Sequence, residues 1–151
     1  MWNKINLNSF CIFLCTTIFA CNGHSELSPF SSDGCSLFPD SFVITKKDWC
    51  ECCFQHDVAY WQGGTELQRE QADVKLKQCV LQKTGNEALS KLMYDGVRVG
   101  GSPYFYNWYR WGYGWSYERK YQALTEHELE QVKRLTEQYL ISNKNNYCDT
   151  R

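Results

Sequence analysis

Residues 50–80, which read CECCFQHDVAYWQGGTELQREQADVKLKQCV, decide the fold of this chain. The stretch from Cys50 to Trp61 predicts a helix that stops at Gly63-Gly64, because paired glycines interrupt a helix. Thr65 and Gln68 then have the spacing of a capping box, which satisfies amide groups that the first turn of a helix leaves unpaired. Two helices joined by so short a connection should run antiparallel, so the sequence predicts a helical hairpin.

The rest of the chain predicts more helix and little strand. The second helix of the hairpin should extend to about Lys83, and a third is expected from Asn86 to Val97, where apolar residues recur at steps of four. Thr125 and Glu128 repeat the capping-box spacing and open a last helix that ends near Ser142. Strand patterns are weak throughout, so we expect an all-α fold.

The N-terminal residues have the features of a secretory leader. Residues 10–20 are mostly apolar, too short a stretch for the roughly 20 residues that span a bilayer but suited to the core of a signal peptide. The stretch ends at Ile18-Phe19-Ala20-Cys21, which resembles the lipobox of bacterial lipoproteins. We therefore expect residues 1–20 to be removed and Cys21 to carry a lipid that anchors the protein in the cell envelope. The alternative is ordinary cleavage nearby and a freely secreted protein.

The chain after the leader divides into a tether and one domain. Residues 22–32 are rich in Ser and Gly, so residues 21–32 are expected to form a tether. Residues 33–48 hold turn residues without a helical period and predict a long loop. A chain of 151 residues has room for a single core, so residues 33–151 are expected to form one domain.

Cysteine count and charge narrow the class of protein. Nine cysteines indicate a disulfide framework or a metal cluster. The spacing Cys50-x-Cys52-Cys53-x-x-His56 leaves zinc as an alternative, although it is crowded and a secreted chain favours oxidation. Without the leader and the anchor, six cysteines remain, enough for three bridges. The 16 basic and 17 acidic residues give a net charge of -1, which argues against a nucleic-acid partner.

Two polar residues fall at matching distances from the turn of the hairpin. His56 lies eight residues before Gly64 and Asp73 lies nine after it, so each is roughly 12–14 Å from the turn at the rise of a helix. Facing each other across the hairpin, the Asp73 carboxylate can bond one imidazole nitrogen and leave the other to take a proton from water. Tyr60, one turn beyond His56, should also reach Asp73.

Neighbouring residues on the first helix point in different directions. Asp57 is rotated about 100° from His56 around the helix, and its carboxylate, beside a loop of exposed carbonyls, suits a hard cation such as calcium. Cys52 and Cys53 diverge by the same angle, so we expect them to bond the helix to two different segments.

The hairpin thus carries a specific arrangement of cysteine, histidine, aspartate and tyrosine, which reads Cys52-Cys53-x-x-His56-Asp57, then Tyr60, Asp73 and Cys79. This arrangement resembles that of the secreted phospholipase A2 family, over about residues 33–81. The resemblance implies two antiparallel, disulfide-linked catalytic helices with additional helices and a long calcium-binding loop. It also implies hydrolysis of a glycerophospholipid ester, in which His56 activates water, Asp73 orients His56 and Tyr60 supports Asp73.

The resemblance further implies a calcium ion. Its ligands would be Asp57 and the backbone carbonyls of Gly34, Ser36 and Phe38, and calcium would polarise the ester carbonyl and stabilise the oxyanion. The family has a glycine-rich run here, whereas two of the glycine positions are filled by Ser36 and Phe38. Glycine permits backbone angles that other residues rarely adopt, so this loop is the main departure from the family pattern.

By the same resemblance, Cys35 pairs with Cys53 and Cys52 pairs with Cys79, which leaves Cys50 for Cys148. The family usually has one more bridge between its two catalytic helices. Both of those cysteine positions hold alanine in this chain, at Ala59 and Ala72. Two small residues in contact would allow the helices to approach closely without a bridge.

Residues 104–121 are unusual because ten of these eighteen residues are aromatic. One interpretation is that they cover and complete a small core. The other is that their Trp and Tyr side chains lie at a membrane interface, and the two roles can share the segment. Outside it, Asp95 and Arg98 are expected on exposed helix turns.

The sequence supports three classes of function. The first is calcium-dependent hydrolysis of glycerophospholipid esters, of phospholipase A2 type, by a monomer that works at a phospholipid or membrane surface. The second is a catalytically weak or inactive lipoprotein of the same fold, which binds lipid or a protein partner, and the altered calcium loop favours it. The third is a structural component of the envelope, with neither binding nor turnover.

Overall fold

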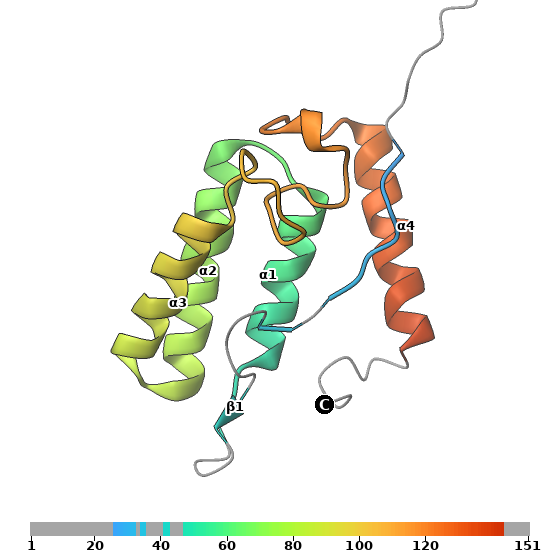
Figure 1. The fold of residues 1–151 in the computed structure, drawn as a ribbon. Helices are drawn as coiled ribbons and strands as arrows, with labels where there is room; N and C mark the ends of the chain where they lie inside the picture. The colour runs from blue at the N-terminus through green and yellow to red at the C-terminus, as the bar shows by residue number, and fades with distance from the viewer. Residues whose placement is uncertain (1–25, 33, 36–40, 43–46, 144–151) are drawn as a thin grey trace, which may run out of the picture.

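The computed structural model describes residues 26–32, 34–35, 41–42 and 47–143. The helices within these ranges are α1 (Cys50–Gln62), α2 (Glu66–Thr84), α3 (Glu87–Gly100), α4 (Glu126–Ser142) and the short 3-10 helix η1 (Tyr117–Arg119). Two strands of two residues each, β1 (Ser41–Phe42) and β2 (Lys47–Asp48), pair antiparallel. The described chain is otherwise helix and loop, which confirms the expected all-α class (Figure 1).

Several expectations fall on residues outside these ranges. They concern the signal peptide at residues 1–20, the lipid anchor at Cys21, the calcium ligands Ser36 and Phe38, and the bridge partner Cys148. Within the described ranges, no helix combines the length and the apolar character that crossing a bilayer requires.

The helical hairpin forms as its sequence predicts. Helix α1 ends at Gly63, where φ is 68°, and φ at Gly64 is 136°, so both glycines adopt backbone angles that other residues rarely reach. Thr65 accepts a hydrogen bond from the Gln68 amide while the Gln68 side chain bonds the Thr65 amide, which completes the predicted capping box. A side chain at Gly63 would also collide with the backbone of Gly112.

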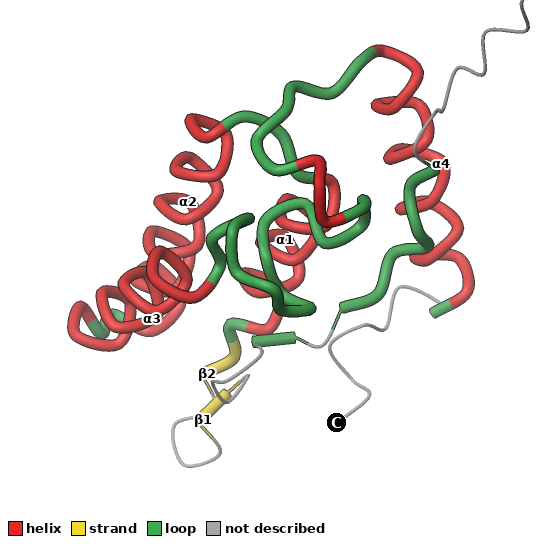
Figure 2. Tube along the Cα trace, turned by 45° about the horizontal axis from the view of Figure 1, so that its top comes forward, coloured by secondary structure: helices red, strands yellow, loops and turns green. Residues whose placement is uncertain are grey.

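Helix α3 returns along α2, and the three helices lie side by side (Figures 1 and 2). Gly85 ends α2 with a left-handed φ of 66°, and the Asn86 side chain caps α3 by accepting a hydrogen bond from the Leu89 amide. The core between these helices holds Leu76, Val80 and Met93 together with disulfide cysteines. Helix α3 therefore buries apolar side chains of α2.

The segment 26–32 is not a tether, which corrects that part of the sequence prediction. Leu27 is 3% exposed and Phe30 is 6% exposed, and both pack in a core cluster with residues of α1 and α4. The Phe30 ring lies 5.2 Å from the Trp61 ring and 4.7 Å from the Tyr139 ring between centroids. In Figure 1 this segment runs alongside α4. Two apolar residues thus outweigh the Ser-rich composition around them.

The aromatic segment 104–121 caps the C-terminal end of α1. The last carbonyls of a helix lack partners within the helix, and here the indole N–H groups of Trp115 and Trp111 donate to the carbonyls of Gln62 (2.7 Å) and Gly64 (2.9 Å). The Gly112 amide donates to the Tyr60 carbonyl at 2.6 Å. Trp111 and Trp115 are buried, so this part of the segment completes the core.

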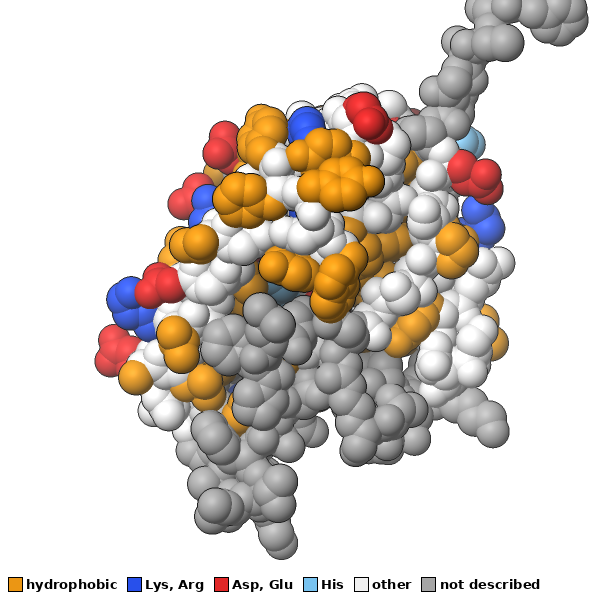
Figure 3. Space-filling model, viewed as in Figure 1, with side chains coloured by type: hydrophobic (Ala, Val, Ile, Leu, Met, Phe, Trp, Pro, Cys, Tyr) orange, Lys and Arg blue, Asp and Glu red, His pale blue; other side chains and the backbone are white. Residues whose placement is uncertain are grey.

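The start of the same segment faces solvent. Four of its side chains are more than half exposed: Tyr104, Phe105, Tyr106 and Trp108. Figure 3 shows hydrophobic side chains gathered on the face that carries the loop after α3. The two interpretations of the aromatic segment therefore apply to different residues, and the exposed group remains the candidate for membrane contact.

Replacing Phe30 by Ala tests whether the segment 26–32 belongs to the core. Because Phe30 packs against rings of α1 and α4, we expect Phe30→Ala to lower the free energy of unfolding by about 3 kcal/mol, measured by urea denaturation. Ser28→Ala is the matched control, since the Ser28 side chain is exposed and only its backbone forms the bonds to Gly114 and Trp61. Equal stability of the two variants would mean that the segment is a tether after all.

Candidate functional site

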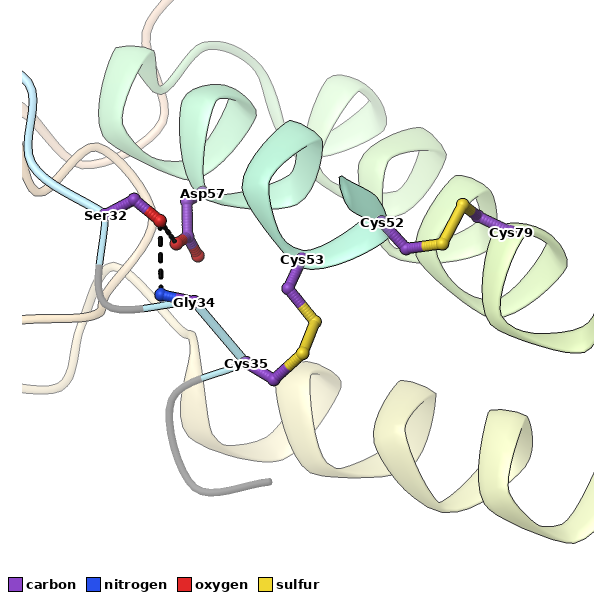
Figure 4. The surroundings of a disulfide bond; sticks show 7 residues. All are labelled: Ser32, Gly34, Cys35, Cys52, Cys53, Asp57 and Cys79. Carbon is purple, nitrogen blue, oxygen red and sulfur yellow. Dashed lines mark hydrogen bonds between the residues drawn. A yellow bond between two sulfur atoms is a disulfide. The ribbon is translucent and has the colours of Figure 1, made fainter. Parts of the chain in front are cut away.

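Two disulfides fasten α1 to its surroundings. Cys53 is bonded to Cys35 and Cys52 to Cys79, as the resemblance implied. Figure 4 shows that the two bonds leave α1 in different directions, one toward α2 and one toward the segment that holds Gly34. Because these cysteines are oxidised in pairs, they supply no zinc ligands. Cys50 is also disulfide-bonded, while its expected partner Cys148 lies outside the described residues.

Ala59 and Ala72 lie in contact with one shared cluster of side chains. Ala72 is buried with Tyr60 and Trp111, and the partly buried Ala59 packs against the same group. The positions where the family would have a further bridge are therefore filled by small residues at the interface of the two helices.

His56 and Asp73 meet across the hairpin. His56 Nε2 lies 2.8 Å from Asp73 Oδ1, and the Tyr60 hydroxyl donates to the same oxygen at 2.8 Å. Asp73 is fully buried, and the His56 and Tyr60 side chains are at most 9% exposed. The predicted contacts of all three residues are confirmed, because helical rise and a short turn fix their register.

Two arginines complete the surroundings of Asp73, and the sequence reasoning missed both. Arg98 Nη1 donates to Asp73 Oδ2 at 2.8 Å, which corrects the expectation that Arg98 lies on an exposed turn. Arg69 is 3% exposed and its Nε lies 3.9 Å from the same oxygen. Arg69 stands four residues before Asp73, a spacing that places two residues on one helix face, so it could have been found. Arg98 could not, because its contact depends on how α3 packs.

Arg69 also forms hydrogen bonds to three other parts of the structure. Its Nε donates to the Tyr60 hydroxyl at 3.1 Å and its Nη1 to the Tyr121 hydroxyl at 2.8 Å. Its Nη2 donates to the carbonyls of Val97 and Arg98 near the end of α3. One side chain of α2 therefore links α1, α3 and the aromatic segment.

Burial and hydrogen bonding set the protonation states of Asp73 and Tyr60. Burial alone favours the neutral acid of Asp73, but hydrogen bonds from His56, Arg98 and Tyr60 outweigh it, so the pKa of Asp73 is lowered. For Tyr60, burial and then the negative charge of Asp73 raise the pKa well above its ordinary value. The group at neutral pH is therefore an Asp73 carboxylate that accepts a bond from a neutral Tyr60 phenol.

A carboxylate that accepts a bond from His56 Nε2 selects one form of the neutral imidazole. In that form the proton is placed on Nε2 by its bond to the carboxylate, and Nδ1 keeps its lone pair. Within the described residues, Nδ1 of His56 has no hydrogen-bond partner, and the side chain lines a cavity. His56 is thus arranged to accept a proton from a molecule in that cavity.

The cavity has a volume of about 1070 Å³. Its polar part includes His56, Asp57 and Tyr60 of α1, and Ser32 and Gly34 of the segment beside it. Its apolar part comes from α2, α3 and the aromatic segment and includes Leu76, Met93, Val97, Trp108 and Tyr113. The lining of this cavity therefore combines a candidate base with mostly apolar surface.

Asp57 points toward the segment that holds Ser32 and Gly34 (Figure 4). Its Oδ2 accepts a hydrogen bond of 2.5 Å from the Ser32 hydroxyl, and Ser32 Oγ in turn accepts from the Gly34 amide at 3.1 Å. Gly34 has a φ of 74°, an angle suited to glycine. The other two expected calcium ligands, Ser36 and Phe38, lie outside the described residues.

These atoms are hard oxygen donors of the type that calcium prefers. The Asp57 carboxylate and the Ser32 hydroxyl are in direct contact, and the disulfide from Cys35 to Cys53 holds the chain after Gly34 against α1. The described residues contain no cluster of three or more His, Cys, Asp or Glu side chains that would hold a metal.

Comparisons with models of known protein families, with curated proteins and with solved structures found no match for this chain.

Neutralising Asp73 tests whether the buried charges depend on one another. Asp73→Asn leaves Arg69 and Arg98 without their carboxylate, so we expect a loss of about 3 kcal/mol or more in the free energy of unfolding at pH 7. Because the folded carboxyl has a lowered pKa, this advantage of the wild type is complete above the unfolded pKa near 4 and shrinks as the pH falls below it.

The measurement is urea denaturation of both proteins between pH 7 and pH 3. Tyr60→Phe is the control, since it removes one neutral hydrogen-bond donor and should cost about 1 kcal/mol. A constant gap between wild type and Asp73→Asn over this pH range would contradict the assignment of a buried carboxylate.

Proposed function

We propose that this protein is a phospholipase A2-type hydrolase that cleaves glycerophospholipid esters with the help of calcium. The single observation that carries the proposal is the bond between His56 Nε2 and the buried Asp73, which leaves Nδ1 as a base on the wall of a largely apolar cavity. The resemblance in the hairpin points to the same chemistry, and the cavity of about 1070 Å³ is large enough for an acyl chain.

The reaction follows from these contacts. His56 Nδ1 removes a proton from a water molecule, and the resulting hydroxide attacks the ester carbonyl. Asp73 stabilises the imidazolium that forms and keeps its ring in place, while Tyr60 and Arg98 hold the two oxygens of Asp73. His56 then returns the proton to the leaving alkoxide when the tetrahedral intermediate collapses, so the products are a fatty acid and a lysophospholipid.

Calcium would be held by Asp57 and oxygen atoms of the Ser32 to Gly34 segment, together with the implied carbonyls of Ser36 and Phe38. When bound there, it supplies positive charge that polarises the ester carbonyl. The protein would act at a membrane, held by the anchor proposed at Cys21 and by the exposed aromatic residues 104–108.

Removing the base should abolish the activity. We expect His56→Asn to lower the rate of fatty-acid release from phospholipid vesicles by about 1000-fold or more, because no other group then accepts the proton from water. His127→Asn is the matched control, since His127 lies exposed in the first turn of α4. Chelation of calcium and Asp57→Asn should each reduce release strongly. Wild-type protein that folds but releases no fatty acid with added calcium would refute the proposal.

One contact favours the alternative, a lipid-binding protein without turnover. The Ser32 hydroxyl donates a hydrogen bond to an oxygen of Asp57, and this bond competes with calcium for that carboxylate. The alternative predicts that vesicle binding persists in His56→Asn and needs no calcium. Calorimetric titration of the protein with calcium separates the two: binding at millimolar concentration or below supports the enzyme, and lack of binding supports the alternative.

A further inference from the structure

Arg110 is a buried cation that the proposed reaction does not use. The residue is 9% exposed, follows the exposed aromatic residues of the segment after α3, and lines the same cavity as His56. A buried cation in this position should have an anionic partner, either in the protein or in a ligand.

The partners of its guanidinium are all neutral. Nη1 donates to the carbonyls of Gly112 (2.6 Å) and Trp111 (3.4 Å), and Nη2 donates to the carbonyl of Trp115 (2.8 Å). A guanidinium has five N–H donors, so these bonds leave at least two. No hydrogen bond of Nε is among those of Arg110, and Nε is not among the buried atoms that lack a partner, so this donor has access to the cavity or to solvent.

Arg110 differs in this respect from the other arginines that are largely buried. Arg69 and Arg98 share the carboxylate of Asp73, and Arg119 pairs with Glu128 at 2.7 Å. Among the described residues, no carboxylate lies within 4.0 Å of the Arg110 guanidinium. Glu118 is close enough to act on it through space, but that side chain is exposed to solvent.

An unpaired charge in such a place is costly. Burial lowers the pKa of Arg110, and the nearby Tyr117 and Glu118 offset this only in part. Arginine keeps its proton even so, which means that the folded protein holds a partly desolvated positive charge at the cavity wall. A negatively charged ligand would remove that cost and gain charge-assisted hydrogen bonds.

The neighbours of Arg110 indicate what else the ligand carries. The guanidinium lies 5.5 Å from the centroid of the Tyr117 ring, and the Tyr117 and Tyr106 rings are 4.9 Å apart. Both rings line the cavity together with Arg110. The lining of this cavity also includes the apolar side chains of Met93 and Val97. A small inorganic anion would leave these apolar surfaces uncovered, whereas an ester with a hydrocarbon chain would cover them.

We propose that Arg110 is the anion-recognition residue of this cavity and that it binds the phosphate ester group of a lipid whose hydrocarbon chain lies along the apolar wall. The planar guanidinium presents parallel N–H groups that match two oxygens of a phosphate. The inference rests on the proposed function for the class of lipid, and it assigns the phosphate group to a residue outside the hairpin that carries the family resemblance.

A comparison of two ligands tests the proposal on the unaltered protein. The first is dihexanoylphosphatidylcholine below its micelle concentration, and the second is dihexanoylglycerol, which has the same chains and no phosphate. Binding is followed by tryptophan fluorescence in excess chelator, so that neither calcium nor hydrolysis contributes. We expect the phosphate ester to bind at least about tenfold more tightly. Equal affinities would overturn the proposal.

Variants then show whether Arg110 causes the difference. Arg110→Met should abolish the preference for the phosphate ester. Arg110→Lys keeps the positive charge but loses the paired N–H donors of the guanidinium, so it should retain part of the preference. Arg134→Gln removes an exposed charge of α4 and should change nothing. Because Arg110 also bonds backbone carbonyls, near-ultraviolet circular dichroism must show that the loop remains folded. If Arg110→Met does not fold, the test uses the comparison of the two ligands on the wild type and on Arg110→Lys. A preference for the phosphate ester that is undiminished in Arg110→Lys overturns the proposal.

Two further arms separate the sources of the anion. Inorganic phosphate and hexanoate should compete with the phosphate ester only at much higher concentrations, and competition by either at equal concentration overturns the assignment to a lipid phosphate. A protein that binds the ester through Arg110 but releases no fatty acid would refute the proposed hydrolysis and leave this inference intact.

Discussion

The fold and the candidate site depend on one buried carboxylate. Asp73 of α2 accepts hydrogen bonds from His56 and Tyr60 of α1 and from Arg98 of α3, with Arg69 beside it. Each of the three helices must be in its correct position for this charge to be satisfied. The helices therefore cannot pack in another register without leaving an ion uncompensated, and the contact that orients His56 is the same one that defines the packing.

The aromatic segment between α3 and α4 serves the core and the cavity together. The indole N–H groups of Trp115 and Trp111 satisfy the last carbonyl of α1 and the carbonyl of Gly64 in the turn that follows. Tyr106 and Trp108 line the cavity and remain more than half exposed. Rigid buried rings thus support exposed ones within a few residues of chain. A loop held in this way can present apolar side chains to a lipid without collapsing onto the cavity.

Local rules predict the part of the site that lies within the hairpin. The contact between His56 and Asp73 follows from helical rise and a two-glycine turn, which involve only nearby residues. The contact of Arg98 with Asp73 depends on how α3 packs on α2, and no spacing in the sequence encodes that. The burial of segment 26–32 has a related cause. Composition describes an average, whereas burial of Leu27 depends on the side chains that α1 and α4 bring near it.

The buried segment also limits where the domain can stand relative to a membrane. If the lipid is attached at Cys21, Leu27 is the sixth residue after the anchor and is already part of the core. An extended chain spans at most about 3.5 Å per residue, so the segment between Cys21 and Leu27 reaches at most about 20 Å. The domain would be confined to a thin layer above the bilayer, where its local concentration at the lipid surface is high and its choice of partners is restricted to that one membrane.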